Sequence, residues 1–171
     1  MKLAIPGLAR GGREILGPIE LALGPTEAVA LLGPSGIGKT TLLRLVAGLE
    51  SAGAGAVTGA GRVAMVFQEP TLLPWRRVAE NIALPTGCDA ATARRLVGEV
   101  GLAGREDAYP RALSLGQQRR VALARAFAAR PDTLLLDEPF VSLDPEVSAA
   151  MQGLLIGLVE AYPVRVILVT H

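Results

Sequence analysis

The sequence predicts an α/β fold with a mainly parallel sheet, a small N-terminal antiparallel β part and a helical insert. An apolar run, Ala28–Leu32, leads into the glycine-rich stretch 33–40, which opens a segment with helical spacing. Two further apolar runs, Thr133–Asp137 and Val164–Thr170, alternate with helical segments. Such alternation is typical of a parallel sheet covered by helices.

Length and composition narrow the class of protein. The 171 residues fit one domain with its own core. The net charge of +1 gives no electrostatic reason to expect a nucleic-acid partner. No uninterrupted apolar run reaches the roughly 18–20 residues of a membrane span, despite the positive mean hydropathy. Cys88 is the single cysteine, so no disulfide framework or cysteine metal site is expected.

The first 32 residues are expected to form short strands, of which Ile19–Leu23 and Ala28–Leu32 have the clearest pattern. The dipeptides between them are typical of turns, namely Pro6–Gly7, Gly11–Gly12, Gly17–Pro18 and Gly24–Pro25. A helix follows the glycine-rich stretch and ends before Gly48. Residues 51–61 favour a loop with a weak hairpin, and Arg62–Phe67 favours a strand.

From Thr71 to about Pro110 the pattern becomes helical and irregular, with candidate helices at Val78–Leu84 and Ala91–Val100. The helical insert is expected at about 71–118, within the single domain 1–171. A long helix is predicted from Ser114 to Ala129, stopped by Arg130–Pro131. Another helix is predicted from Val147 to Ala161.

The glycine-rich stretch matches the phosphate-binding pattern G-x-x-x-x-G-K-[ST]. Its members are Gly33, Pro34, Ser35, Gly36, Ile37, Gly38, Lys39 and Thr40. In such a motif a strand leads into a glycine loop that opens a helix. Several backbone N–H groups and the positive end of the helix then point at one place. Lys39 would contact the phosphates and the Thr40 hydroxyl would ligate Mg²⁺. A chance glycine-rich turn is the alternative, and the agreement of motif and context makes it improbable. The pattern therefore predicts a nucleoside triphosphate site.

Two further observations support this site. The chain has only two lysines, Lys2 and Lys39, so its other cations are arginines. A compact point charge suits a phosphate. Asp137 and Glu138 follow an apolar strand, which places both acids at the ligand-binding edge of a parallel sheet. Asp137 is predicted to hold Mg²⁺, and Glu138 to accept a proton from the attacking water or to orient it.

At this point the chain resembles the ATP-binding cassette (ABC) ATPases. Leu113-Ser114-Leu115-Gly116-Gln117 is similar to their signature motif, LSGGQ in its common form, and lies shortly before the Asp137–Glu138 strand. The helix after it is also similar. Gln68 resembles the Q-loop glutamine, Ser142–Asp144 the D-loop, and His171 the switch histidine. The ordered set covers nearly the whole chain and implies a P-loop NTPase (RecA-like) fold.

The resemblance implies a site shared between two copies. Ser114, Gly116 and Gln117 would cap the γ-phosphate of ATP bound to the other copy's phosphate loop, giving a head-to-tail dimer. Read alone, Ser114 is a helix N-cap. Glu138, His171 and Gln68 would be catalytic, and Thr40, Gln68 and Asp137 would hold the metal. The nucleotide-binding set is Gly33 to Lys39, Thr40, Thr41, Ser114, Gly116, Gln117 and Asp144.

The segment Phe67–Arg76 is similar to that of bacterial nitrate-, sulfonate- and taurine-type importers, where Leu-Pro-Trp follows the Q-loop. There the helical insert docks integral membrane permease subunits, which would place this chain on the cytoplasmic face of the inner membrane. Trp75, the only tryptophan, would suit such an interface. Burial inside the insert is the alternative for Trp75.

Four departures from the family pattern carry expectations. Leu115 replaces the usual first glycine of the signature, which predicts weakened capping. Only Arg10 stands where an aromatic residue usually stacks on adenine, and a guanidinium can also stack on a base. The region between the first helix and Gln68 is short. The chain stops at His171, where family members continue, so we expect a chain truncated after the switch histidine and prone to fraying there.

Together these features predict an ATP hydrolase that uses ATP and Mg²⁺ and works as a homodimer to power solute import. A non-transport ABC ATPase of DNA repair or translation is a rival, but coiled-coil arms, paired cassettes and basic surfaces are not visible. A P-loop kinase of small metabolites would leave the signature unexplained. An ATP-binding fragment that does not cycle is the main competitor, because the chain ends early.

Overall fold

A computed structural model describes residues 1–53 and 55–171; the side chains of Arg10 and Arg13 also lie outside the described part. The chain forms two compact units. The first unit comprises residues 1–65, 131–138 and 164–171, and the second comprises 66–130 and 139–163. Each unit therefore draws on segments that are far apart in the sequence.

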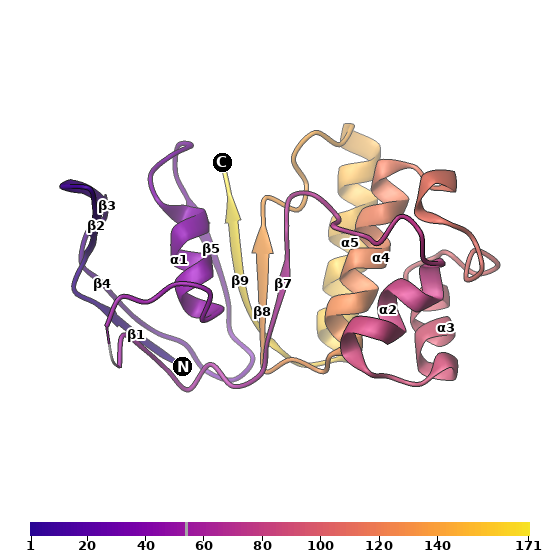
Figure 1. Cartoon of the computed structure of the whole chain (residues 1–171), viewed down its shortest axis with the longest axis horizontal. Helices are drawn as coiled ribbons and strands as arrows, with labels where there is room; N and C mark the ends of the chain where they lie inside the picture. The colour runs from indigo at the N-terminus through magenta and orange to yellow at the C-terminus, as the bar shows by residue number, and fades with distance from the viewer. Residues whose placement is uncertain (54) are drawn as a thin grey trace. The chain divides into compact units, whose positions relative to one another are not determined.

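The parallel sheet has the strand order β5-β9-β8-β7, with the four strands side by side (Figure 1). Its strands are β5 (Ala28–Leu32), β9 (Arg165–Thr170), β8 (Thr133–Asp137) and β7 (Val63–Val66). β9 pairs in parallel with β5 and β8, Leu168 lying opposite Ala30 on one side and Leu136 on the other. All five residues of β8 are buried, as expected for a strand covered on both faces. The predicted mainly parallel α/β sheet is confirmed.

The first 58 residues supply the antiparallel part. β1 (Lys2–Ile5) lies between β4 (Ile19–Ala22) and β6 (Val57–Thr58), and β2 (Leu8–Arg10) pairs with β3 (Arg13–Leu16). The predicted hairpin within 51–61 is wrong for the described residues. The ladder there runs to β1, with Val57 opposite Leu3, because this pairing places Val57 against the core.

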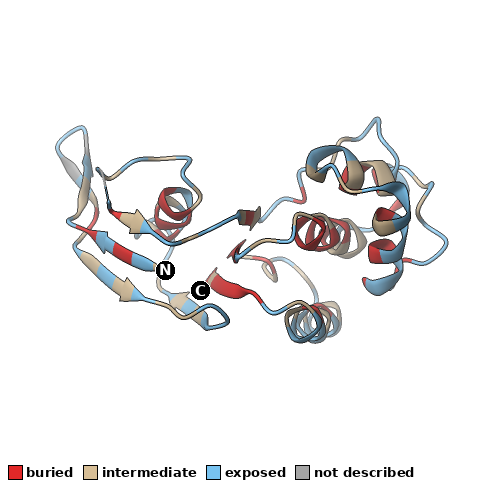
Figure 2. Ribbon diagram, turned by 90° about the horizontal axis from the view of Figure 1, so that it is seen from below, coloured by how far each residue is buried: buried red, intermediate tan, exposed pale blue. Residues whose placement is uncertain are grey.

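The core of the first unit is built around α1 (Lys39–Val46), which follows the glycine-rich stretch. Gly48 has φ 71° just beyond the helix, the left-handed conformation that commonly ends helices. Figure 2 shows buried positions in red on both strands and helices. The residues that share this core are Leu3, Ile5, Leu16, Leu42, Leu43, Leu45, Val46, Ala56, Leu135, Ile167 and Val169.

The second unit is helical. Its elements are α2 (Val78–Thr86), α3 (Ala90–Glu99), the 3₁₀ turn η1 (Pro110–Ala112), α4 (Leu115–Ala128) and α5 (Pro145–Ala161). α4 packs against α2, α3 and α5. α5 begins earlier than predicted because Asp144 caps it and Pro145 occupies the first helical position, where proline is favoured. Within the described residues, the helices are too short or too polar to cross a membrane.

Candidate functional site

The phosphate loop between β5 and α1 is shaped by its glycines. Gly36 and Gly38 have φ angles of 81° and 99°, a region that favours glycine. A Cβ atom at Gly38 would lie 2.5 Å from both the Ile15 carbonyl oxygen and the Leu16 Cδ2 atom of β3. β3 therefore leaves room only for a glycine where the loop enters the helix.

Lys39 begins α1 and turns its side chain back into the loop. Lys39 is 8% exposed. Its ammonium donates hydrogen bonds to the Gly33 oxygen at 2.5 Å and to the Pro34 oxygen at 3.0 Å. An ammonium has three donors, so these bonds leave one for an anion at the loop. The cation is thus held at the positive end of a helix, where anions bind readily.

Thr40 and Asp137 meet although they are 97 positions apart in the sequence. The Thr40 hydroxyl donates to Asp137 Oδ1 at 3.2 Å. Asp137 ends β8 and is 7% exposed. Burial raises the pKa of the Asp137 carboxyl, the Thr40 hydrogen bond opposes this rise, and the nearby charge of Glu138 adds to it. A cation at this point would favour the ionised carboxylate.

The Thr40–Asp137 pair fits magnesium. Mg²⁺ prefers oxygen ligands and is usually bound by one or two protein groups together with water and substrate phosphates. A hydroxyl and a carboxylate beside a phosphate loop meet this requirement. The described part of the chain holds no cluster of three or more His, Cys, Asp or Glu that would form an all-protein cage.

Glu138 adopts an unusual backbone conformation directly after β8. Its φ angle is 47°, rare for a residue with a side chain, and its N–H donates to the Val169 oxygen at 3.0 Å. Its Oε1 atom lies 2.7 Å from His171 Nε2, which is also 3.4 Å from the Ser35 hydroxyl. The strained turn thus brings the carboxylate, the imidazole and the phosphate loop into one chain of contacts.

The first unit therefore gathers the predicted residues of the phosphate loop and of two strand ends. They are Gly33 to Thr41, Asp137, Glu138 and His171. Gln68, Ser114, Gly116, Gln117 and Asp144 belong to the second unit. Gln68 is exposed in a bend just after β7.

The signature segment forms the start of α4. Ser114 is its N-cap, as predicted: its hydroxyl accepts from the Gln117 N–H at 3.3 Å, and the Ser114 N–H donates to Gln117 Oε1 at 3.0 Å. A Cβ at Gly116 would lie 2.9 Å from Val147 Cγ1 of α5, so the second glycine allows the two helices to approach. Leu115 is 44% exposed and leaves this packing intact.

Two arginines of α4 hold the segments that follow β7 and β8. Arg119 is 4% exposed and donates to the oxygens of Pro139 at 3.3 Å and Val141 at 2.5 Å. Burial lowers the pKa of the Arg119 guanidinium. These bonds fix the stretch that leads to Asp144, whose carboxylate accepts from the Val147 N–H at 2.9 Å and caps α5.

Arg125 does the same for the segment after Gln68. It donates to the oxygens of Pro70 at 2.9 Å and Thr71 at 3.0 Å, and to the Thr71 hydroxyl at 3.0 Å. Burial lowers the pKa of the Arg125 guanidinium. Sequence reasoning missed Arg119 and Arg125 as anchors; their signal was a charged residue in a helix otherwise rich in Ala, Val and Leu.

Trp75 is 69% exposed, so the alternative of burial inside the insert is wrong. The buried Asn81, which holds the turn around Trp75, was also missed, since a lone amide in an apolar helix gives no pattern. The side chain of Arg10, named for base stacking, lies outside the described residues.

Comparison with known proteins identifies relatives. A family model described as ABC transporter matches residues 16–141. The chain is 49% identical to the aliphatic sulfonates import ATP-binding protein SsuB 1 of Rhodococcus jostii, over 92% of this chain and 66% of that protein. It is 48% identical to SsuB 3 of Paraburkholderia xenovorans, over 100% of this chain and 71% of that protein. The chain therefore spans about two thirds or slightly more of these relatives' length.

A solved structure gives the same picture of the fold. It is the dimeric post-hydrolysis state of an ATP-binding cassette bound to ADP and Pi. The TM-score is 0.82 at 28% identity, and the match covers 99% of this chain and 87% of that chain. The predicted P-loop NTPase architecture is therefore confirmed by a structural neighbour.

Proposed function

The chain belongs to the ABC transporter family of ATP hydrolases, and we propose that it binds Mg-ATP, pairs head-to-tail with a second copy and hydrolyses ATP to power solute import. The resemblance to nitrate-, sulfonate- and taurine-type importers is confirmed by the sulfonate import relatives. The observation that carries the proposal is the group of Lys39, Thr40, Asp137, Glu138 and His171 around one phosphate loop.

The proposed chemistry is mainly positioning and neutralisation of charge, because phosphoryl transfer asks little covalent chemistry of the protein. Lys39 and the loop N–H groups would hold the β- and γ-phosphates. Thr40 and Asp137 would hold Mg²⁺, which neutralises charge on the phosphates when bound. Glu138 would accept the proton of the attacking water, and His171, 2.7 Å away, would orient that carboxylate and contact the γ-phosphate region.

The dimer would complete the site. Ser114, at the start of α4, presents a helix N-terminus, which favours anions. We propose that this end, with Gly116 and Gln117, caps the γ-phosphate on the partner copy, and that Gln68 and Asp144 complete the metal and nucleotide contacts. The dimeric structural neighbour supports the arrangement.

The proposed partners are integral membrane permease subunits that contact the helical insert near Trp75. The exposed indole supports this surface, because tryptophans are common in the centres of interfaces. The proposed location is the cytoplasmic face of the inner membrane. Aliphatic sulfonates are the proposed solute class, since the relatives' names specify their import.

The deciding experiment is the solution mass of Glu138→Gln with and without Mg-ATP, with fluorescent-nucleotide binding as a control. The substitution keeps the shape of the side chain but removes the base, so ATP should accumulate in the closed dimer. An ATP-dependent shift from monomer to dimer is expected. Nucleotide binding without dimerisation would contradict the shared site and favour an ATP-binding chain that does not cycle.

A further inference from the structure

The segment between Gln68 and α2 ends in a tight turn, residues 73–77, which we call the Trp75 turn. The Arg76 N–H donates to the Leu73 oxygen at 3.1 Å and closes the turn. Pro74 restricts the backbone within it. The Trp75 side chain stands on the surface with 69% of the residue exposed. An exposed tryptophan is a side chain of the kind that anchors protein interfaces.

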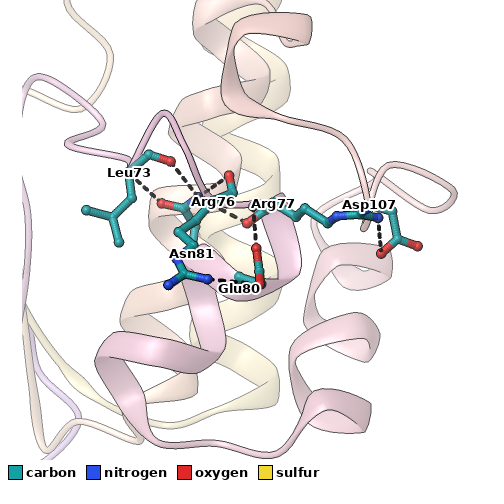
Figure 3. A network of polar contacts seen from close by, with 6 residues as sticks. All are labelled: Leu73, Arg76, Arg77, Glu80, Asn81 and Asp107. Carbon is teal, nitrogen blue, oxygen red and sulfur yellow. Dashed lines mark hydrogen bonds and ion pairs between the residues drawn. The ribbon is translucent and has the colours of Figure 1, made fainter.

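Asn81 anchors this turn from below (Figure 3). It is the single asparagine of the chain, lies in the first turns of α2 and is 0% exposed. Its amide nitrogen donates to the oxygens of Leu73 at 3.1 Å, Arg76 at 3.0 Å and Arg77 at 3.0 Å. Its oxygen accepts from the Leu73 N–H at 2.6 Å. Three carbonyls facing one nitrogen fix the orientation of the amide.

The charged side chains around the Trp75 turn add little to the stability that Asn81 gives it. The Arg77 N–H donates to Glu80 Oε2 at 2.8 Å, Arg76 pairs with Glu80 at 3.5 Å, and Arg77 pairs with Asp107 at 3.4 Å (Figure 3). These side chains are roughly half exposed. Exposed pairs stabilise weakly, whereas a buried amide that satisfies backbone groups stabilises strongly. Asn81 therefore dominates the conformation of the Trp75 turn.

We propose that Asn81 is a positioning residue, which holds the Trp75 turn in one conformation before a partner arrives and so presents the indole ready for docking. A preformed contact lowers the entropy lost on association. The partner we assign is a membrane-subunit helix with an apolar face, and this assignment rests on the proposed function. The fixing of the turn by Asn81 does not depend on it.

The first test uses Trp75 itself, because the only tryptophan makes intrinsic fluorescence specific for the turn. Time-resolved anisotropy separates fast local motion of the indole from tumbling of the protein. Asn81→Ala should raise the amplitude of the fast component at least about twofold, because four hydrogen bonds to the turn are lost. An unchanged amplitude would overturn the inference.

A matched pair of variants separates the turn from the helix. Asn81→Ser can still bond the Arg77 carbonyl four residues back but is too short for Leu73, so it should loosen Trp75 as alanine does. It also secures the test should alanine prevent folding. Thr86→Ala removes a 2.7 Å hydrogen bond to the Ile82 oxygen at the other end of α2. It should leave Trp75 unchanged, and equal loosening by Thr86→Ala would count against Asn81 as the anchor.

The second test measures binding to the purified membrane subunits of an aliphatic sulfonate importer in detergent. Trp75→Ala and Asn81→Ala should each weaken binding, the latter about tenfold, while nucleotide affinity stays unchanged. If Trp75→Ala binds normally, the docking proposal falls, and the anisotropy result on Asn81 stands apart from it. If only Asn81→Ala binds normally while its Trp75 is loosened, the positioning role is overturned.

Discussion

The phosphate loop of the first unit and the turns of the second unit are held by different means. In the first unit, the phosphate loop is shaped by its own backbone: glycines with positive φ angles, a close approach at Gly38 and two carbonyls around Lys39. In the second unit, the turns are held by side chains, namely the buried Asn81 and Arg119 and the partly buried Arg125. The phosphate loop should therefore be sensitive to added atoms, and the turns of the second unit to the loss of hydrogen-bond donors.

The chemistry of the first unit is an exception to this contrast, because there side chains act on the ligand. Lys39→Ala gives the largest expected effect: nucleotide affinity falls about 10³-fold or more, since the charge-assisted contact of its ammonium with the phosphates is lost and the Gly33 and Pro34 oxygens of the loop lose their donor. Titration with a fluorescent ATP analogue measures it. Retained affinity would mean that the backbone N–H groups alone bind the phosphates.

Glu138→Gln separates chemistry from binding. Turnover of ATP should fall about 10³-fold because the general base is removed, while nucleotide affinity and unfolding stay close to the parent. Steady-state phosphate release measures the first and denaturant titration the second. Strong residual hydrolysis would remove Glu138 from the role of base.

Gly38→Ala tests the backbone side of the comparison, with Gly36→Ala as its control. Both glycines have positive φ, which costs an alanine about 1 kcal/mol. Only the Cβ at Gly38 meets β3, at 2.5 Å, so its total loss of unfolding free energy should reach about 3 kcal/mol. Chemical denaturation measures both, and equal losses would refute the role assigned to β3.

Arg119→Met tests the side-chain half. The unfolding free energy should fall by about 2 kcal/mol, because the Pro139 and Val141 oxygens lose their donor. Arg120→Met is the matched control on the same helix. Arg120 makes one 3.3 Å bond to the Val100 oxygen, so we expect a loss below about 1 kcal/mol. The comparison fails if the two variants unfold alike.

The smallest expected effect concerns pH. Burial raises the pKa of Asp137, so this carboxylate is protonated at a higher pH than an ordinary aspartate. As pH falls toward that pKa, Mg²⁺-dependent nucleotide affinity should drop by less than about tenfold. The free energy of unfolding should instead rise as pH falls. The raised pKa means that the ionised Asp137 carboxylate destabilises the folded state, and this cost disappears when the group is protonated. Asp137→Asn should abolish both trends in binding and unfolding titrations.

The same contrast explains what the sequence could predict. Residues 28–40 and 133–138 can be recognised in the sequence by their apolar runs and glycine spacing. The structure places their side chains together. Asn81 bonds nearby backbone, whereas Arg119 and Arg125 bond distant backbone, and each acts as a single side chain whose partners no spacing rule reveals. β6 was missed because a two-residue strand depends on the distant Leu3 for its pairing. The 69% exposure of Trp75 likewise needed three-dimensional structure to decide between its two interpretations.

The scarcity of lysine has a practical consequence for labelling. Within residues 1–171, amine-reactive reagents meet two lysine side chains, Lys2 at the start of β1 and Lys39. Lys39 is 8% exposed, and its ammonium lies inside the phosphate loop. Its acylation rate, read by mass spectrometry, would act as a footprint of that loop with almost no background from the rest of the chain.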